Sequence, residues 1–172
     1  MKLVGKKVYL RYLHIDDANG NYPNWLNDTI VCQYNSHGDK LYTKEMAKEY
    51  IEFVTNSLAH KVFAICDLKT DKHIGNISLQ QISEKNKSAE FAILLGEKEF
   101  MGKGYANEAS KILIQYGFMN LKLHRIYCGT SILNIPMQKL ALCLGMEQEG
   151  IKKDALFKNK EFIDLIEYAI IN

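Results

Sequence analysis

Two glycines separated by a single residue, Gly102 and Gly104, stand where the character of the sequence changes. The run over 89–95 is apolar and has the length of a β-strand, whereas after Gly104 the apolar residues recur at steps of three and four, as in an amphipathic helix. The first N–H groups of a helix have no intrahelical acceptor, and glycines let an anion approach the main chain closely. Residues 101–106 therefore predict a turn that binds a phosphate group.

Glu90 is the carboxylate within the apolar strand, and it is the first candidate for a general base. Partial burial would raise the pKa of such a group toward the range of a useful base. Alternation places Glu90 opposite the bulkier side chains of Phe91 and Ile93, so we expect the bulkier face to pack on a helix and Glu90 to face a cleft. The alternative is an exposed residue that points away from the core. His37, in a polar loop, is the rival base, although a loop histidine is more often structural or solvated.

Aromatic residues in the N-terminal part of the chain could form one wall of an acceptor site. Tyr34 and Tyr42 lie in a segment over 30–42 that shows no lasting period, and such loops often shape pockets. Trp25 could belong to the same wall. Core packing is the favoured alternative for Trp25, because cores use the same residue types.

Other chemistries have little support. No serine stands in a nucleophile-elbow context, and Gly104 is followed by Tyr105 rather than by the Lys-Ser/Thr pair of a Walker-type nucleotide site. The cysteines form no CxxC pair and have no metal-like histidine spacing around them, so we expect small buried hydrophobes in a reducing compartment and no metal site: Cys32, Cys66, Cys128 and Cys143.

Length and composition predict one domain over 1–172, since 47% hydrophobic residues and only 2 prolines are enough for a packed core. The net charge of +2 gives no reason to expect a nucleic-acid partner. Four lysines over 152–160 are either a solvated loop or a contact for a phosphorylated ligand. Lysines near the N-terminus and the absence of a membrane-spanning run predict a soluble, cytoplasmic protein with no membrane partner.

The element pattern predicts a mixed α/β sandwich rather than a doubly wound sheet. The segment after Asp16, a plausible N-cap, is expected to form two short helical pieces divided near Asn21, and Thr43 is expected to cap a helix that ends near Leu58, with Met46, Tyr50, Phe53 and Val54 in its apolar stripe. Gly75 suggests a bulge or close packing. Strands are predicted over 8–13, 62–68, 73–79, 89–96, 125–130, 146–151 and 162–171, and further helices after Gly104 and over 134–144.

The string from Met101 to Ala106, Met-Gly-Lys-Gly-Tyr-Ala, resembles the Gln/Arg-x-x-Gly-x-Gly/Ala signature of the Gcn5-related N-acetyltransferases, with Met101 where Arg or Gln is usual. The longer string GKGYANEA is similar to the subgroup related to the ribosomal-protein N-terminal acetyltransferases. The order of later features also fits that subgroup, with a strand that begins at His124, a helix that Asn134 opens, and Leu144-Gly145-Met146 at the helix end. The resemblance covers nearly the whole chain.

The resemblance implies the fold of the acyl-CoA N-acyltransferases, a mixed and mostly antiparallel central sheet flanked by helices. It also implies that the strand over 89–96 splays from its neighbour over 125–130 and holds the pantetheine arm of acetyl-CoA through main-chain groups. The cofactor-binding residues implied in this way are Ile93, Leu94, Leu95, Met101, Gly102, Lys103, Gly104, Tyr105 and Ala106. Asn134 can bind the pantetheine or cap its helix, and Ala141 stands where the family frequently has a tyrosine as general acid.

The function that the resemblance implies is an N-acetyltransferase that moves acetyl from acetyl-CoA to a primary amine of a small acceptor by direct attack in a ternary complex. An amino sugar, which in this broad group is often nucleotide-linked, is the first acceptor to consider, and a protein N-terminus is the second. A CoA-binding module without turnover remains the alternative from another class, because of Met101 and Ala141. We expect a monomer or homodimer.

Overall fold

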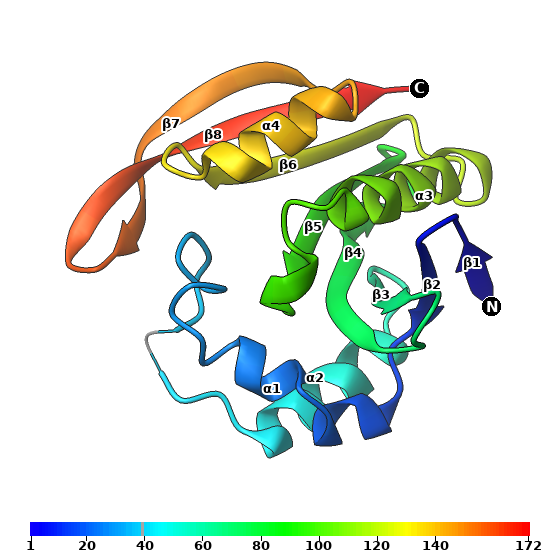
Figure 1. Cartoon of the computed structure of the whole chain (residues 1–172). Coiled ribbons are helices and arrows are strands. Elements are labelled where there is room, and N and C mark those ends of the chain that lie inside the picture. The colour runs from blue at the N-terminus through cyan, green and yellow to red at the C-terminus, as the bar shows by residue number, and fades with distance from the viewer. Residues whose placement is uncertain (39) are drawn as a thin grey trace.

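The computed structural model describes residues 1–38 and 40–172, and over these residues eight strands form one sheet in the order β1-β2-β3-β4-β5-β6-β8-β7 (Figure 1). All neighbouring pairs are antiparallel except β5 and β6, which are parallel. This mixed, mostly antiparallel α/β sheet is the predicted fold class. The strands are β1 (Lys2–Val4), β2 (Val8–Tyr12), β3 (Lys61–Asp67), β4 (His73–Ser83), β5 (Ser88–Leu95), β6 (Arg125–Ser131), β7 (Glu147–Lys158) and β8 (Glu161–Ile171).

Helices cover both faces of the sheet, as Figure 1 shows. Side chains of α3 and α4 share one core cluster with Leu10, Phe63 and Ile65, whereas the N-terminal helices and α2 share the other with Tyr9 and Ala64. Consecutive strand residues therefore enter opposite cores, as the pleat requires. The helices are the 3-10 helices η1 (Ile15–Asn19) and η2 (Lys98–Phe100) and the α-helices α1 (Tyr22–Trp25), α2 (Lys44–Thr55), α3 (Tyr105–Met119) and α4 (Ile135–Cys143). None of the helices within these described ranges is long and apolar enough to cross a membrane.

The N-terminal region agrees in outline with the sequence and differs in detail. Two short helical pieces divided near Asn21 are present, but the prediction that Asp16 caps the first piece was wrong. His14 is the N-cap, since its ring nitrogen accepts from the Asp16 N–H and its own N–H donates to Asp17. Strand β1 was not predicted at all, because a run of three residues is too short to show a period.

The helix α2 begins where it was predicted, since the Thr43 hydroxyl accepts a hydrogen bond from the Met46 N–H. It ends at Thr55, three residues before the predicted end. The predicted apolar stripe was confirmed for Tyr50 and Val54 and was wrong for Met46 and Phe53, which are exposed; Ala47 and Ile51 complete the buried face of the helix. The face differs because Ala47, Ile51 and Val54 share one core cluster with residues of η1 and β3.

The C-terminal hairpin is longer than the sequence predicted. Strand β7 runs to Lys158, well beyond the strand start that was predicted over 146–151, and it pairs with β8 through register shifts between Gln148 and Gly150 and between Lys152 and Leu156. Exposed lysines hide the period-two pattern in this stretch. The hairpin extends beyond the rest of the sheet in Figure 1 and reaches toward the loop after α1.

Candidate active site

The turn between β5 and α3 has the geometry of an anion site. Gly102 and Gly104 both lie in the left-handed region, with φ of 71° and 85°, and Gly104 is the N-cap of α3. No described atom outside the turn lies within 4 Å of the place where a Cβ of Gly102 would stand, so the main chain there is open. The first hydrogen bond within the helix runs from the Glu108 N–H to the Gly104 carbonyl at 3.1 Å. The N–H groups of 105–107 therefore have no acceptor within the helix and can serve a phosphate.

The N-terminal hairpin holds this turn in place. The Glu108 carboxylate accepts hydrogen bonds from the main-chain N–H groups of Lys6 and Lys7, the second at 2.7 Å. The Lys7 ammonium donates to the Lys103 carbonyl at 2.9 Å. A Cβ on Gly5 would stand 2.3 Å from the Glu108 carboxylate, so this clamp requires glycine there. The clamp joins segments about a hundred residues apart, and no local sequence pattern indicates it.

Strands β5 and β6 separate beside the turn. Over the described residues, their parallel pairing is confined to Ser88–Glu90 on β5 and Arg125–Tyr127 on β6, whereas β4 remains paired with β5 as far as Leu95. The β5 main chain from 91 to 95 therefore has one edge that β6 does not cover. The splay implied by the resemblance is present. Ile93, Leu94 and Leu95 are half-buried along this edge, and their role in holding a pantetheine arm stays a prediction.

The turn and the open strand edge fit acetyl-CoA in complementary ways. The turn supplies main-chain donors for phosphates, and the edge supplies donors and acceptors for the amides of the pantetheine arm. Met101 and Lys103 are exposed on the turn, while Tyr105 and Ala106 are half-buried in the first turn of α3. The side chain of Met101 offers no positive charge, so any recognition of a phosphate at this position would fall to main-chain groups, and the cofactor-binding roles of these residues stay predictions.

Asn134 acts as a helix cap in this structure. Its side-chain oxygen accepts from the Met137 N–H at 3.2 Å, and its amide donates to the Thr130 hydroxyl at 3.0 Å. This is one of the two roles that the sequence left open. Ala141 is the fully buried residue of α4, so its position offers packing but no proton donor for a departing thiolate.

Glu90 lies where β5 and β6 part. It is the last β5 residue paired with β6, opposite Tyr127, and it is half-buried. Phe91 and Ile93 pack in the core that contains α3. Leu94, which lies on the same face of the strand as Glu90, packs against the opposite core. The predicted orientation of the strand is therefore observed, with the bulkier face toward α3. The Glu90 carboxylate accepts a hydrogen bond from the Gln81 amide at 2.7 Å.

Trp25 belongs to the core rather than to an open wall. Its side chain is 3% exposed, and its indole N–H donates to the Glu97 carboxylate at 2.9 Å. A Cβ on Gly96 would stand 2.0 Å from the indole, which shows how closely the ring packs on the end of β5. Burial alone raises the pKa of Glu97, but hydrogen bonds led by the one from Lys72 outweigh it and lower that pKa. The indole thus anchors α1 to the strand that leads into the glycine turn.

The loop after α1 meets the tip of the C-terminal hairpin. The Lys158 ammonium donates to the main-chain carbonyls of Asn35 and His37, each at 2.7 Å. The rings of His37 and Tyr42 lie edge to face with centroids 5.8 Å apart, and Tyr34 is half-buried in the same loop. Asp39 lies outside the described residues.

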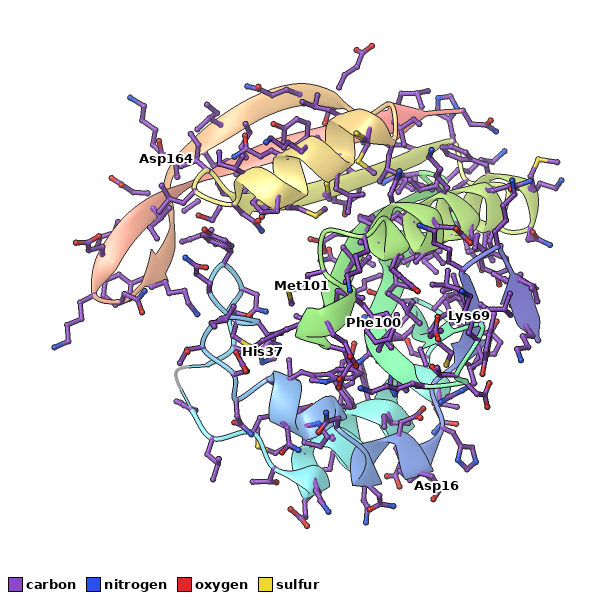
Figure 2. All side chains as sticks on the ribbon, viewed as in Figure 1. Asp16, His37, Lys69, Phe100, Met101 and Asp164 are labelled. Atoms are coloured by element: carbon purple, nitrogen blue, oxygen red, sulfur yellow. The ribbon has the colours of Figure 1, made fainter. Side chains whose placement is uncertain are left out.

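Figure 2 shows His37 on this loop and Met101 on the turn that follows β5. Partial desolvation, and then the charge of Lys158, lower the pKa of His37. A lowered pKa keeps the imidazole neutral at pH 7, which suits a base. The sequence did not single out Lys158 from the other lysines around it, because only the fold brings the hairpin tip to this loop.

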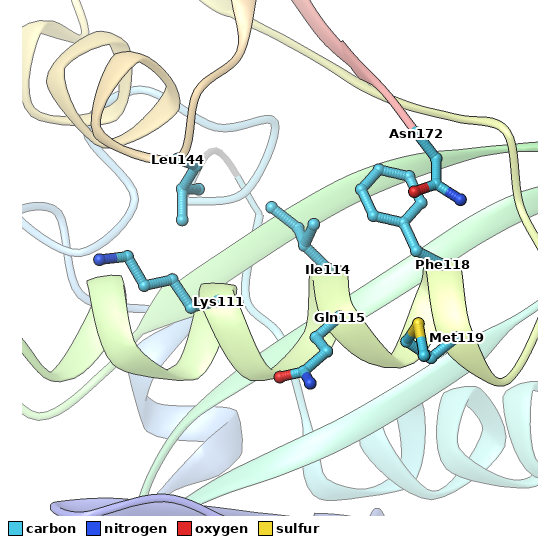
Figure 3. A pocket seen from close by; sticks show the side chains of 7 residues that line it. All are labelled: Lys111, Ile114, Gln115, Phe118, Met119, Leu144 and Asn172. Carbon is cyan, nitrogen blue, oxygen red and sulfur yellow. The ribbon is translucent and has the colours of Figure 1, made fainter.

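A separate cavity of about 280 Å³ lies on the outer side of α3, between that helix, the end of α4 and the C-terminus (Figure 3). Its lining is Lys111, Ile114, Gln115, Phe118, Met119, Leu144 and Asn172. The cavity begins more than one turn beyond the head of α3 and includes neither the glycine turn nor the open edge of β5. It is therefore distinct from the candidate active site.

A mixed sheet that opens beside a glycine turn at the head of a helix defines the fold of the acyl-CoA N-acyltransferases. The family model described as "Acetyltransferase (GNAT) domain" matches residues 7–147 of this chain. The chain is 30% identical over 182 residues to the uncharacterized N-acetyltransferase p20 of Bacillus licheniformis, with 98% of this chain and 95% of the relative covered. The chain therefore belongs to the GNAT acetyltransferases, which makes it an acetyl-CoA-dependent N-acetyltransferase.

Two further comparisons concern proteins whose names include an acceptor. The chain is 26% identical over 161 residues to spermidine N(1)-acetyltransferase of Escherichia coli K12, with 94% of this chain and 80% of the relative covered. The solved structure of RimL, a ribosomal L7/L12 alpha-N-protein acetyltransferase in complex with CoA, superposes with a TM-score of 0.91 at 18% identity and covers 99% of this chain and 98% of that one. The second likeness establishes the shared fold.

Proposed function

We propose that this enzyme acetylates a primary amine of a small acceptor by direct attack on acetyl-CoA in a ternary complex, with Glu90 as the base. The observation that carries the proposal is the place of Glu90, the last paired residue before β5 and β6 separate. A carboxylate there stands beside the open edge of β5 and on the face away from α3. The acceptor amine and the thioester can therefore meet next to it.

The chemistry requires a base because alkylammonium groups have pKa values of about 10.4 and only the neutral amine attacks. Glu90 takes one proton from the ammonium, and the freed electron pair forms the new N–C bond. Main-chain N–H groups on the open edge of β5 stabilise the oxyanion that develops on the carbonyl. The C–S bond then breaks, and the second proton of the attacking nitrogen passes through water to the departing sulfur, which gives the amide and the CoA thiol. The thiolate needs little help to leave, since thiol pKa values lie at about 8.5. Ala141 is consistent with such unassisted departure.

The acceptor is the finer part of the proposal. The sequence favoured an amino sugar, and the names of the relatives add a polyamine and a protein N-terminus. A polyamine is supported by the E. coli relative, since the match covers 94% of this chain. It is also supported by the carboxylate of Glu90, which attracts cations. We therefore place spermidine first among the acceptors to test and amino sugars second.

The test is a screen for amine-dependent release of CoA thiol from acetyl-CoA. The acceptors are spermidine, glucosamine, a nucleotide-linked amino sugar, and a peptide with a free N-terminus. Turnover with a small amine that falls in Glu90→Gln supports the proposal. Release with the peptide alone would overturn the small-acceptor assignment, and parental turnover by Glu90→Gln would transfer the role of base to His37.

A further inference from the structure

Strand β4 contains a bulge beside the proposed base. The ladder between β4 and β5 reaches the pair Gln80 and Glu90 and resumes at Ser83 and Ser88, so β4 uses one residue more than β5 between these pairs. Gln81 lies in this bulge with φ of 50°, in the left-handed region that residues other than glycine rarely adopt. The Ile82 N–H donates to the Ala59 carbonyl at 3.0 Å instead of joining the ladder. The bulge is therefore fixed from outside the β4–β5 pair.

The bulge changes the direction of one side chain. Gln80 stands opposite Glu90 and shares its face. The Gln80 amide donates a hydrogen bond to the Ser78 hydroxyl at 2.9 Å. Regular alternation would send the next side chain, Gln81, to the opposite face, where it could not reach Glu90. Instead, the Gln81 amide donates to Oε2 of Glu90 at 2.7 Å. Bulges next to active sites re-aim side chains in this way, and backbone strain at such a place indicates a functional constraint.

The hydrogen bond acts at the point where the two strands part. Glu90 is paired there with Tyr127. Burial of the Tyr127 hydroxyl raises its pKa most, and the charge of Glu90 raises it further. A carboxylate has two oxygens, and the amide occupies Oε2, which leaves Oε1 for the acceptor. The Gln81 amide is neutral, and its NH2 group donates hydrogen bonds but does not take up protons at neutral pH. It can therefore orient the carboxylate without competing for the proton of the amine.

We propose that Gln81 is a positioning residue, which the bulge turns toward Glu90 so that Oε1 faces the acceptor amine. This inference rests on the proposed role of Glu90 as the base. It explains why a strained residue is held at this place in β4.

The experiment removes the donor and keeps the shape of the side chain. Gln81→Met is measured with saturating acetyl-CoA, with spermidine as the first acceptor and otherwise with the fastest amine of the screen. We expect kcat/KM for the acceptor to fall about 10-fold, the scale of one hydrogen bond to a charged group, while the Kd for CoA stays at the parental value. The matched control is Gln148→Met, at an exposed glutamine on β7, which should keep parental kinetics. Gln81→Gly, which relaxes the backbone and removes the amide, should fold and lose activity to the same degree.

A double-mutant cycle separates this role from a structural one. In a Glu90→Gln background, Gln81→Met should cause no further loss, because its only route to the reaction is through the carboxylate. A further 10-fold loss in that background, or parental activity in both Gln81 variants, would overturn the positioning role and leave Glu90 as the base. Parental turnover by Glu90→Gln itself would overturn the proposed mechanism and this inference together, so the two failures are distinguishable.

Discussion

Substitution of Gly104 tests whether the glycine turn binds the phosphates of CoA. The residue lies at φ 85° and ψ 0°, where a Cβ costs an L-residue about 1–2 kcal/mol. In Gly104→Ala the new Cβ would stand 3.5 Å from the Lys7 ammonium, which is an ordinary contact with the end of a flexible side chain. The loss of stability is therefore conformational strain alone. We expect the free energy of unfolding to fall by about 1 kcal/mol, which lowers Tm by about 2–4 °C for a chain of this size.

The effect on cofactor affinity should be larger than the effect on stability. The Cβ covers main chain that a phosphate must approach, so we expect the Kd for CoA to rise at least about 10-fold, or by about 1.4 kcal/mol. Isothermal titration at fixed ionic strength measures this change. Gly104→Asn separates the two effects, because asparagine tolerates the left-handed region: stability should recover and affinity should not. Gly20→Ala, at a glycine with φ of −84° away from the turn, is the control and should bind CoA like the parent.

One result would refute this reasoning. If Gly104→Val folds normally and binds CoA as tightly as the parent, the phosphates do not sit on this turn. Lys103→Met provides a comparison within the same turn. Its exposed side chain supplies only screened attraction, so its effect on Kd should be smaller than that of Gly104→Ala.

Three further outcomes are expected. Glu90→Gln should keep the fold and the Kd for CoA but lower turnover by about 10²–10⁴-fold at neutral pH, with partial recovery at higher pH where more free amine exists; an unchanged pH profile would count against the base. Lys158→Met, which releases the hairpin tip from the loop, should raise the acceptor KM about 3-fold in initial-rate measurements with little change in the Kd for CoA, whereas the exposed Lys153→Met should change neither. Burial raises the pKa of Asp17, but hydrogen bonds, led by the one from Arg11, outweigh burial and hold this pKa well below the ordinary value of about 3.9. The ionised Asp17 therefore stabilises the fold above about pH 3.9, and this contribution is lost as the pH falls toward the lowered pKa. Asp17→Asn should therefore reduce the free energy of unfolding in urea by about 2 kcal/mol at pH 7 and make its decline below pH 4 less steep.

The glycine turn could be read from the sequence because its signals are local. An apolar run of strand length, two closely spaced glycines and a helical period follow one another within a few residues, and each is a direct consequence of backbone geometry. The same local logic gave the Thr43 cap and the face of β5 that packs on α3. It failed for α2, where the choice between two possible apolar faces depends on which partner the helix meets, and for β1, whose three residues are too few to define a period.

Tertiary structure decided the surroundings of Glu90 and of the loop after α1. The sequence could nominate Glu90 by its type and its strand, but the Gln81 bond depends on a bulge whose position is set by pairing with β5 and by Ala59. Lys158 reaches the loop that contains His37 across more than a hundred residues of chain. For Trp25 the sequence favoured core packing over a wall, and the tertiary structure buries it, with the indole close to Gly96. Residue type and local period determine which elements form, whereas contacts between distant segments arise from packing and leave no periodic trace in the sequence.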